Sequence, residues 1–311
     1  MRIVVTGGAG FIGSHTVDLL LQNNFQVTVL DNLISGKLSY LNLAHPNLKF
    51  IQGDILNFPL LLTLLKECDA VLHLAALPSV IKSIADPLTS FKVNTEGFLH
   101  LLQMIRQLNR PIRLVYASSA AVYGNNIRLP CQDQDESSST EMALSPYALE
   151  KANNERYANL YDYLFGMKSL GLRYFNVYGT RQDPKSPYAG VISKFIEYYQ
   201  QDEPILVFGD GSQSRDFIHV SDVARANLKA LQSDCFGVLN IATGKAENLL
   251  DLITYIEMAG RKKTKLDFVS ARPGDITHSC ASTDKAEKYL DFRYETNLRE
   301  GISSLLKIGY T

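Results

Sequence analysis

Long apolar runs are missing from the sequence. No stretch approaches the ~18 consecutive apolar residues that a membrane-spanning helix needs. The chain opens directly into a short strand-like segment, without the layout of a secretory signal peptide. We therefore expect a cytoplasmic protein with no membrane partner.

Cysteine is scarce, and Cys68, Cys131, Cys235 and Cys280 show neither CxxC pairing nor regular spacing. Reduced thiols are therefore expected rather than a disulfide framework. Charge of one sign is not in excess, because 31 lysines and arginines face 32 aspartates and glutamates. A chain without a basic field is not expected to bind nucleic acid. The six histidines lack metal-ligand spacing, so no metal site is predicted.

Apolar residues, in contrast, are plentiful enough for a large core, at 46% of 311 residues. The first half alternates short β-branched or apolar runs with helical patterns such as Ser14–Gln22, which is typical of a parallel sheet covered on both faces. We predict an α/β fold built on a Rossmann-type doubly wound parallel sheet. The expected strands are Arg2–Thr6, Gln26–Asp31, Leu48–Asp54, Ala70–Ala75, Arg113–Ser118 and Ser169–Tyr174.

The regular alternation ends near residue 177, where segments interrupted by proline and glycine follow. Residues 1–176 are predicted to form a dinucleotide-binding domain, to which segments near 217–242 return. Residues 177–311 are expected to form mainly a smaller C-terminal α/β lobe that binds the substrate. The polar stretch Asn125–Pro146 is predicted to be a surface loop. A closing amphipathic helix around Leu298–Leu306 is predicted, with Thr296 as its possible cap.

A glycine-rich turn, Thr6-Gly7-Gly8-Ala9-Gly10-Phe11-Ile12-Gly13, follows the first predicted strand and opens a helix. This is the context of a dinucleotide-binding fingerprint, whose glycines let the backbone approach a pyrophosphate at the helix N-terminus. Asp31 ends the second strand, where a carboxylate accepts the ribose hydroxyls. That carboxylate would repel a 2′-phosphate ~4 Å away by roughly 1 to 4 kcal/mol. The predicted cofactor is therefore NAD rather than NADP.

Two further segments end predicted strands at the same edge of the sheet. Asp54 closes the third strand and Leu74-Ala75-Ala76 closes the fourth. Ligands of open α/β sheets bind along this carboxyl edge. A turn aspartate and packed alanines are also common without function, so both interpretations stay open at this point.

The dipeptide Ser145-Pro146 predicts a helix start, because serine caps free amides and proline suits the first helical position. Tyr147 and Lys151 then lie four residues apart on one face of the helix. Lowering the pKa of a tyrosine from about 10 to about 7 takes roughly 4 kcal/mol of preferential phenolate stabilisation. A neighbouring ammonium and an oxidised nicotinamide can supply it. With Ser118-Ser119 ending the fifth strand, the pattern predicts hydride chemistry carried by Ser119, Tyr147 and Lys151.

Taken together, these motifs resemble the extended short-chain dehydrogenase/reductase family, in its branch of nucleotide-sugar epimerases. The similarity covers almost the whole chain. Matching segments are the glycine-rich turn, Asp31-Asn32-Leu33, Gly53-Asp54-Ile55, Asn94, Ser118–Gly124, the Tyr147/Lys151 pair and Arg173-Tyr174-Phe175-Asn176.

The resemblance implies a set of site residues and a partner. For NAD, it implies contacts from Gly7, Gly10, Phe11, Ile12, Gly13, Asp31, Asn32, Asp54, Ile55, Leu74, Ala75, Ala76, Asn94, Tyr147, Lys151 and Tyr174. For a UDP-sugar substrate, it implies contacts from Ser79, Ser118, Ser119, Asn176, Arg215, Arg272, Asp275 and Ser279. A homodimer joined through a helix bundle is also implied. The candidate apolar residues of that bundle, which core packing explains equally well, are Phe98, Leu101, Leu102, Ile105, Leu149 and Tyr157.

The implied reaction is NAD-dependent 4-epimerisation of a UDP-hexose through a 4-keto intermediate. Related dehydratases and decarboxylases carry an acidic residue where this chain has Ala120 and Ala121, which disfavours both reactions here. Segments 76–80, 83–87 and 178–184 resemble bacterial UDP-N-acetylglucosamine 4-epimerases. Ser279 corresponds to a pocket-gating position, where a serine leaves room for a 2-acetamido group. UDP-GlcNAc and UDP-GalNAc are therefore the expected substrates, with activity on UDP-glucose and UDP-galactose also possible.

Three other functions remain as alternatives. Two are enzymes, a UDP-glucose 4-epimerase and a UDP-glucuronate 4-epimerase or decarboxylase. The third is an NAD-binding redox sensor that has kept the fold without the chemistry. A sensor has no use for an activated phenol, so the Ser119, Tyr147 and Lys151 set favours an enzyme.

Overall fold

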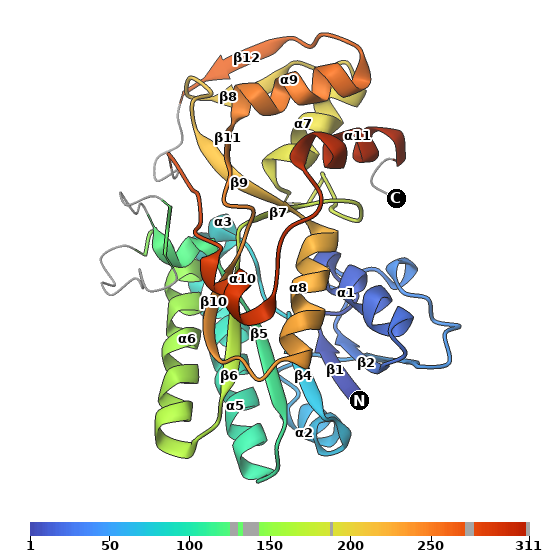
Figure 1. Ribbon diagram of the computed structural model, residues 1–311, viewed down its shortest axis with the longest axis vertical. Coiled ribbons are helices and arrows are strands. Elements are labelled where there is room, and N and C mark those ends of the chain that lie inside the picture. Colours follow the sequence, from blue (N-terminus) through green and yellow to red (C-terminus); the bar gives the residue numbers. More distant parts are fainter. Residues whose placement is uncertain (125–129, 133–142, 187–188, 271–276, 309–311) are drawn as a thin grey trace.

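A large parallel sheet with helices on both faces forms the lower part of the molecule, and a smaller lobe lies above it (Figure 1). The computed structural model describes residues 1–124, 130–132, 143–186, 189–270 and 277–308. Among these residues, no helix is long and apolar enough to cross a membrane. The predicted surface loop, Asn125–Pro146, lies mostly outside the described residues.

The large sheet has seven strands in the order β10-β6-β5-β4-β1-β2-β3, and all neighbouring strands are parallel. The predicted Rossmann-type fold is thereby confirmed. The sheet interior is buried on both faces, as in β6, where every residue is buried, and this explains the uninterrupted apolar runs. The strands are β1 (Arg2–Thr6), β2 (Gln26–Asp31), β3 (Leu48–Gln52), β4 (Ala70–His73), β5 (Arg113–Ser119), β6 (Ser169–Tyr174) and β10 (Gly237–Ile241).

Helices cover each face of this sheet with apolar side chains. On one face, α1 (Phe11–Gln22) packs beside α8 (Val220–Gln232), where Leu20 contributes to the same core as Ala226. On the other face lie α2 (Phe58–Glu67), α5 (Gly97–Gln107) and α6 (Pro146–Phe165), joined by a second core that includes Tyr116 and Ala158. Both α8 and β10 come late in the chain, so the chain returns from the smaller lobe to complete the sheet.

Four of the residues considered for a dimer-forming helix face lie in the core instead. Phe98, Leu101, Leu102 and Ile105 are at most 3% exposed and pack against the sheet. Their spacing on α5 reflects the ordinary requirement of a helix that covers a sheet. Of the two interpretations left open for these four side chains, the structure therefore supports core packing.

The smaller lobe has its own core, in which Phe195, Leu252 and Ile302 are buried. Its strands form a three-stranded sheet, β11-β9-β7, and a pair, β12-β8. Its elements are β7 (Asn176–Tyr178), α7 (Val191–Gln200), β8 (Ile205–Phe208), β9 (Ser214–His219), β11 (Ala246–Asn248), α9 (Leu249–Gly260), β12 (Leu266–Val269) and α11 (Leu298–Ile308).

The closing helix α11 has a different cap from the one predicted. The Asn297 side-chain oxygen accepts a hydrogen bond from the Glu300 amide at 2.9 Å. The Thr296 amide instead donates to the Asp222 carboxylate at 3.1 Å, which ties the start of the helix to α8. The prediction of Thr296 as cap is therefore wrong by one residue, because both residue types suit that position.

Candidate active site

A cleft of about 500 Å³ lies along the carboxyl edge of the large sheet, beneath loops of the smaller lobe. All the predicted cofactor residues except Asn94 line it. So do five of the predicted substrate residues: Ser118, Ser119, Asn176, Arg215 and Ser279. Arg272 and Asp275 lie outside the described residues. The fold therefore gathers most of the predicted site in one place.

The glycine-rich turn needs its glycines for reasons visible in the structure. Gly7 has a φ of +70°, and a Cβ there would lie 2.7 Å from the Ala75 nitrogen. A Cβ on Gly13 would lie 2.2 Å from the Gly7 carbonyl oxygen. Helix α1 has Gly10 as its N-cap, with no side chain bound to its first amides. These amides can therefore hydrogen bond to a pyrophosphate in the cleft, so the turn fits NAD.

Asp31 is held at the end of β2 with its carboxylate directed by two backbone amides. The Ala9 amide donates to Oδ2 at 2.9 Å, and the Leu33 amide donates to Oδ1 at 2.8 Å. Burial raises the pKa of Asp31, while these two hydrogen bonds lower it. Each carboxylate oxygen keeps a further lone pair, which suits it to the hydroxyls of a nucleoside ribose.

The segment after β2 and the smaller lobe meet at the cleft, which the sequence did not reveal. Ser35 and Tyr40, from the segment after β2, line the same cleft as Arg181 and Asp183 of the smaller lobe. The Lys37 ammonium lies 3.1 Å from the Asp183 carboxylate. No motif or spacing links residues so far apart in the chain, so only the fold could reveal them.

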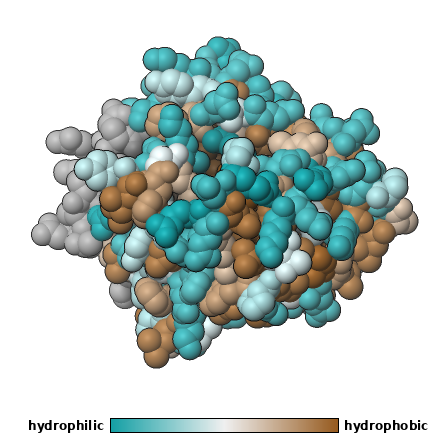
Figure 2. All heavy atoms as spheres, turned by 90° about the horizontal axis from the view of Figure 1, so that it is seen from below, coloured by the Kyte–Doolittle hydropathy of each residue, from teal (hydrophilic) through white to brown (hydrophobic). Residues whose placement is uncertain are grey.

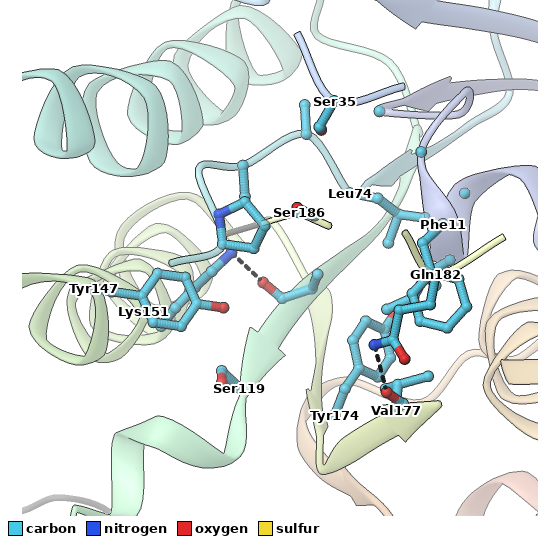
Figure 3. Close-up of a pocket in the computed structure, with 18 of the residues that line it drawn as sticks. Phe11, Ser35, Leu74, Ser119, Tyr147, Lys151, Tyr174, Val177, Gln182 and Ser186 are labelled. Atoms are coloured by element: carbon cyan, nitrogen blue, oxygen red, sulfur yellow. Dashed lines mark hydrogen bonds between the residues drawn. The ribbon is translucent and has the colours of Figure 1, made fainter. Parts of the chain in front are cut away.

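Tyr147, Lys151 and Ser119 converge at the other end of the cleft (Figure 3). Helix α6 begins at Pro146, and the Ser145 hydroxyl accepts a hydrogen bond from the Ala148 amide at 3.2 Å, as predicted. The Lys151 ammonium lies 5.8 Å from the centre of the Tyr147 ring and donates to the Ala117 carbonyl at 2.9 Å. The Tyr147 phenol, the Lys151 ammonium and the Ser119 hydroxyl therefore lie together at this end of the cleft.

The buried environment shifts the pKa of both groups of the pair. Burial lowers the pKa of Lys151 to about 8, and the carboxylates of Glu150 and Glu155 act in the opposite direction. Burial raises the pKa of Tyr147, a hydrogen bond with Ser119 lowers it, and the charge of Glu150 raises it. Burial thus works against the phenolate, in contrast to the lowered pKa that the sequence predicts. A positive charge brought in by a bound ligand would lower the pKa of Tyr147.

The two serines at the end of β5 have different partners. The Ser118 hydroxyl donates to the buried carboxylate of Glu155. Glu155 also accepts two hydrogen bonds from Arg173, at 2.9 and 2.7 Å. Arg173 is 1% exposed; burial lowers the pKa of this guanidinium, but the bonds to Glu155 raise it well above its usual value. Ser119, in contrast, is the serine that hydrogen bonds to Tyr147.

Two predicted residues lie behind the cleft rather than in its wall. Asn94, on η2 (Lys92–Glu96), exchanges hydrogen bonds with the backbone of Leu77 at 2.8 and 3.2 Å, and donates to Glu150 at 2.7 Å. Ser79 caps α3 (Val80–Ala85) through the Lys82 amide at 3.1 Å. Both side chains position the segment that follows β4, which lines the cleft.

The smaller lobe supplies the remaining wall. Asn176 donates to the Asp216 carbonyl at 3.2 Å, at the point where β7 pairs with β9. The Ser279 amide bonds to the Ser214 carbonyl at 3.0 Å, which brings Ser279 beside strand β9. Arg215, on the same strand, donates to carbonyls of Ser214 and Thr277 at 2.9 and 3.3 Å. An arginine that lines the cleft suits phosphate oxygens.

Comparison with known proteins identifies the family. The model of the NAD dependent epimerase/dehydratase family matches residues 3–242. A solved structure of UDP-N-acetylglucosamine 4-epimerase from Methanobrevibacter ruminantium, in complex with UDP-N-acetylmuramic acid, is 39% identical, with a TM-score of 0.91 over 98% of each chain. The Thermus thermophilus UDP-glucose 4-epimerase in complex with NAD is 34% identical, with a TM-score of 0.87 over 99% of this chain and 100% of that one.

Curated relatives include enzymes named for other sugars. A UDP-glucuronate 4-epimerase of Thermodesulfobacterium geofontis is 32% identical over 309 residues, which are 96% of this chain and 93% of that protein. These findings confirm the predicted resemblance and the predicted cofactor. With its glycine-rich turn, its Tyr147/Lys151 pair and a family match over most of its length, the chain belongs to the NAD dependent epimerase/dehydratase family, and its cofactor is NAD.

Proposed function

We propose that this enzyme is a UDP-hexose 4-epimerase that interconverts UDP-GlcNAc and UDP-GalNAc. The observation that carries the proposal is the convergence of Tyr147, Lys151 and Ser119 in a cleft that also contains the NAD-binding turn. Solved relatives named as 4-epimerases of UDP-N-acetylglucosamine and UDP-glucose support the reaction type. In this proposal, residues 1–176, with the returning segments near 217–242, bind NAD, and residues 177–311 mainly bind the UDP-sugar.

Tyr147 is the proposed acid and base. Its phenolate takes the proton of the sugar 4-hydroxyl, and the phenol later returns a proton to the same oxygen on the other face of the sugar. Ser119 hydrogen bonds to this phenol, and Lys151 stabilises its ionised form. NAD, when bound by the glycine-rich turn, would supply reversible hydride transfer at C4, so no external oxidant would be needed.

Inversion requires the sugar to turn over while the nucleotide stays anchored. Arg215 lines the cleft and is proposed to bind the diphosphate, with Arg272 and Asp275 as further proposed ligands of the UDP moiety. An anchor at the diphosphate leaves the hexose free to rotate about its bonds to the phosphate. The carbon that lost hydride can then present its opposite face.

In the described wall of the cleft, the two positions directly after Ser119 carry no acid of the kind that elimination needs. Ala120 and Ala121 line it directly after Ser119, on η3 (Ala120–Tyr123). Removal of water across neighbouring carbons requires an additional group that gives and takes protons. Small apolar side chains at these two positions therefore favour epimerisation over dehydration.

The choice among sugars rests on side chains of the smaller lobe. Ser279 lines the cleft, and a small hydroxyl there leaves space for a 2-acetamido group. A hexuronate would need a cation for its carboxylate. The cleft has three described cationic side chains: Arg181 pairs with Asp18 at 2.8 Å, Lys151 is assigned to Tyr147, and Arg215 is assigned to the diphosphate. These assignments favour a neutral hexose over a uronic acid.

A substrate panel tests the proposed function. NAD-loaded enzyme is mixed separately with UDP-GlcNAc, UDP-glucose and UDP-glucuronate, and products are separated by chromatography. We expect UDP-GalNAc from UDP-GlcNAc, with slower turnover of UDP-glucose and none of UDP-glucuronate. Retained NAD together with no turnover of any UDP-hexose would contradict the proposal and favour the redox sensor.

Replacing Ser279 with tyrosine should change the preference between sugars. The ring would occupy the space assigned to the acetamido group, so kcat/KM for UDP-GlcNAc should fall about ten- to a hundredfold while UDP-glucose is little affected. Ser279→Ala, which keeps the space, is the matched control. Equal losses on both sugars in Ser279→Tyr would show that this residue does not gate the pocket.

We also propose a homodimer that forms through helices α4 (Pro87–Phe91) and α6. Leu88 and Phe91 on α4 are 75% and 50% exposed, and Leu160 and Leu164 on α6 are 45% and 54% exposed. A view of the molecule from below shows hydrophobic side chains exposed between hydrophilic ones (Figure 2). Exposed apolar stripes on neighbouring helices suit a bundle with a second copy.

The dimer is tested by placing charge on this surface. The double variant Leu88→Glu/Leu160→Glu should be monomeric in light scattering, because two like charges would be buried in each copy's interface. Leu250→Glu, at a 39% exposed position on α9 of the smaller lobe, should leave the dimer intact. A monomeric wild-type protein, or a double variant that still dimerises, would refute this interface.

A further inference from the structure

A buried carboxylate belongs to the same helical turn as the two principal residues of the active site. Glu150 follows Tyr147 by three positions on α6 and directly precedes Lys151, and its side chain is 4% exposed. Its partners are two neutral groups from neighbouring elements. The Ser90 hydroxyl on α4 and the Asn94 amide on η2 each donate to Oε2 at 2.7 Å. The carboxylate therefore keeps a full negative charge close to the reacting groups when it is ionised.

The negative charge of Glu150 raises the pKa of both Tyr147 and Lys151. Burial lowers the pKa of Lys151, and the Glu150 carboxylate raises it. Burial raises the pKa of Tyr147, Ser119 lowers it, and Glu150 raises it further. A single negative charge thus makes both groups hold their protons to higher pH.

Within the part of the chain that the structure describes, the other charged groups near the pair are neutralised or exposed. Glu155, one turn further along α6, is paired with Arg173. His73 on β4 faces Lys151, but burial lowers the pKa of this imidazole to about 3, so it is neutral. Further charged residues lie on the elements that pack against the start of α6: Lys82, Asp86, Lys92 and Glu96. All four are partly or fully exposed, so solvent screens their charges.

We propose that Glu150 is a positioning residue that acts through Tyr147 and Lys151, and that its buried charge sets the pH window in which the pair works. The inference rests on the proposed function, because it assigns Glu150 to the same proton transfer. The contacts of Glu150 with Ser90 and Asn94 hold the carboxylate in place. Through Asn94, they also join it to the Leu77 segment behind the cleft.

The test is Glu150→Gln, which removes the charge but keeps a side-chain oxygen that can accept from Ser90 and Asn94. Both limbs of the profile of kcat/KM against pH should move to lower pH, because both groups lose the same negative neighbour. The ratio of kcat/KM on the acidic limb to that on the alkaline limb should rise about threefold or more over wild type.

A second measurement follows the phenol without turnover. The ultraviolet difference between each protein and its Tyr147→Phe counterpart reports ionisation of Tyr147 alone among the 16 tyrosines. In Glu150→Gln this ionisation should occur at lower pH than in the wild-type background. If the wild-type enzyme turned over no UDP-hexose, the proposed function would fail, and this titration would still decide the role of Glu150.

Two control variants separate charge from structure. Ser90→Ala removes one hydrogen bond to Glu150 but leaves its charge, and Asp162→Asn removes a charge from the last turn of the same helix. Both should keep the wild-type positions of the limbs and of the Tyr147 titration. A Glu150→Gln enzyme that lost activity evenly at all pH values, with the Tyr147 titration unmoved, would overturn the inference and leave Glu150 a structural role.

Discussion

Tyr147→Phe should reduce turnover of UDP-GlcNAc by about a hundredfold to ten-thousandfold, the contribution typical of a positioned acid and base. The substitution removes the phenol oxygen that hydrogen bonds to Ser119 and keeps the ring in place. NAD should stay bound, because the glycine-rich turn and Asp31 are untouched. Turnover is measured by product chromatography, and NAD content by its release on denaturation.

Tyr40→Phe is the matched control for this experiment. Tyr40 lines the same cleft at the end near Asp31, so its variant tests the loss of a cleft hydroxyl away from Lys151. We expect less than about a threefold loss of turnover in Tyr40→Phe, since no proton transfer is assigned to that phenol. Activity of Tyr147→Phe within tenfold of wild type would refute the acid and base assignment.

Arg173→Met should destabilise the protein by about 3–5 kcal/mol, because it leaves the Glu155 carboxylate buried without its cation. The two side chains are 1% and 8% exposed, and Arg173 also donates to the Tyr123 hydroxyl at 2.7 Å. The loss is measured as the change in the free energy of unfolding by denaturant titration. Ser118 would keep its bond to Glu155 but could not neutralise the charge.

Two further variants keep this prediction open to refutation even if Arg173→Met does not fold. Arg173→Met/Glu155→Leu removes both charges and should recover much of the stability. Arg2→Met breaks an ion pair whose side chains are 54% and 44% exposed, and should cost less than about 1 kcal/mol. A double variant no more stable than Arg173→Met, or equal losses in Arg173→Met and Arg2→Met, would refute the argument.

The parts of the site that depend on local sequence could be predicted from it. Tyr147 and Lys151 share a helix whose start is encoded by Ser145-Pro146, so their spacing alone places them on one face. The glycine-rich turn and Asp31 belong to a single strand-helix-strand unit with a fixed geometry. Three of the six predicted strands have the observed bounds, and β3 and β4 end two residues earlier than predicted.

Interactions between segments far apart in the chain could not be predicted from the sequence. The Ser118 hydroxyl bonds to Glu155, 37 positions away, and Asn94 bonds to Glu150, 56 positions away. Nothing in a motif says whether a polar side chain faces a ligand or a neighbouring carboxylate. The apolar spacing of Phe98 and Leu101 was equally ambiguous, because a helix needs the same stripe to cover a sheet as to join a partner.

The late return of the chain to the large sheet affects how the protein can be divided. A fragment ending at residue 176 would lack β10, so β6 would become an edge strand with open backbone amides and carbonyls. It would also lack α8 and expose the apolar side of α1, including Val17 and Leu20. Such a truncation product would be prone to aggregate, so the large sheet and its helices cannot be obtained by simply removing the C-terminal part of the chain.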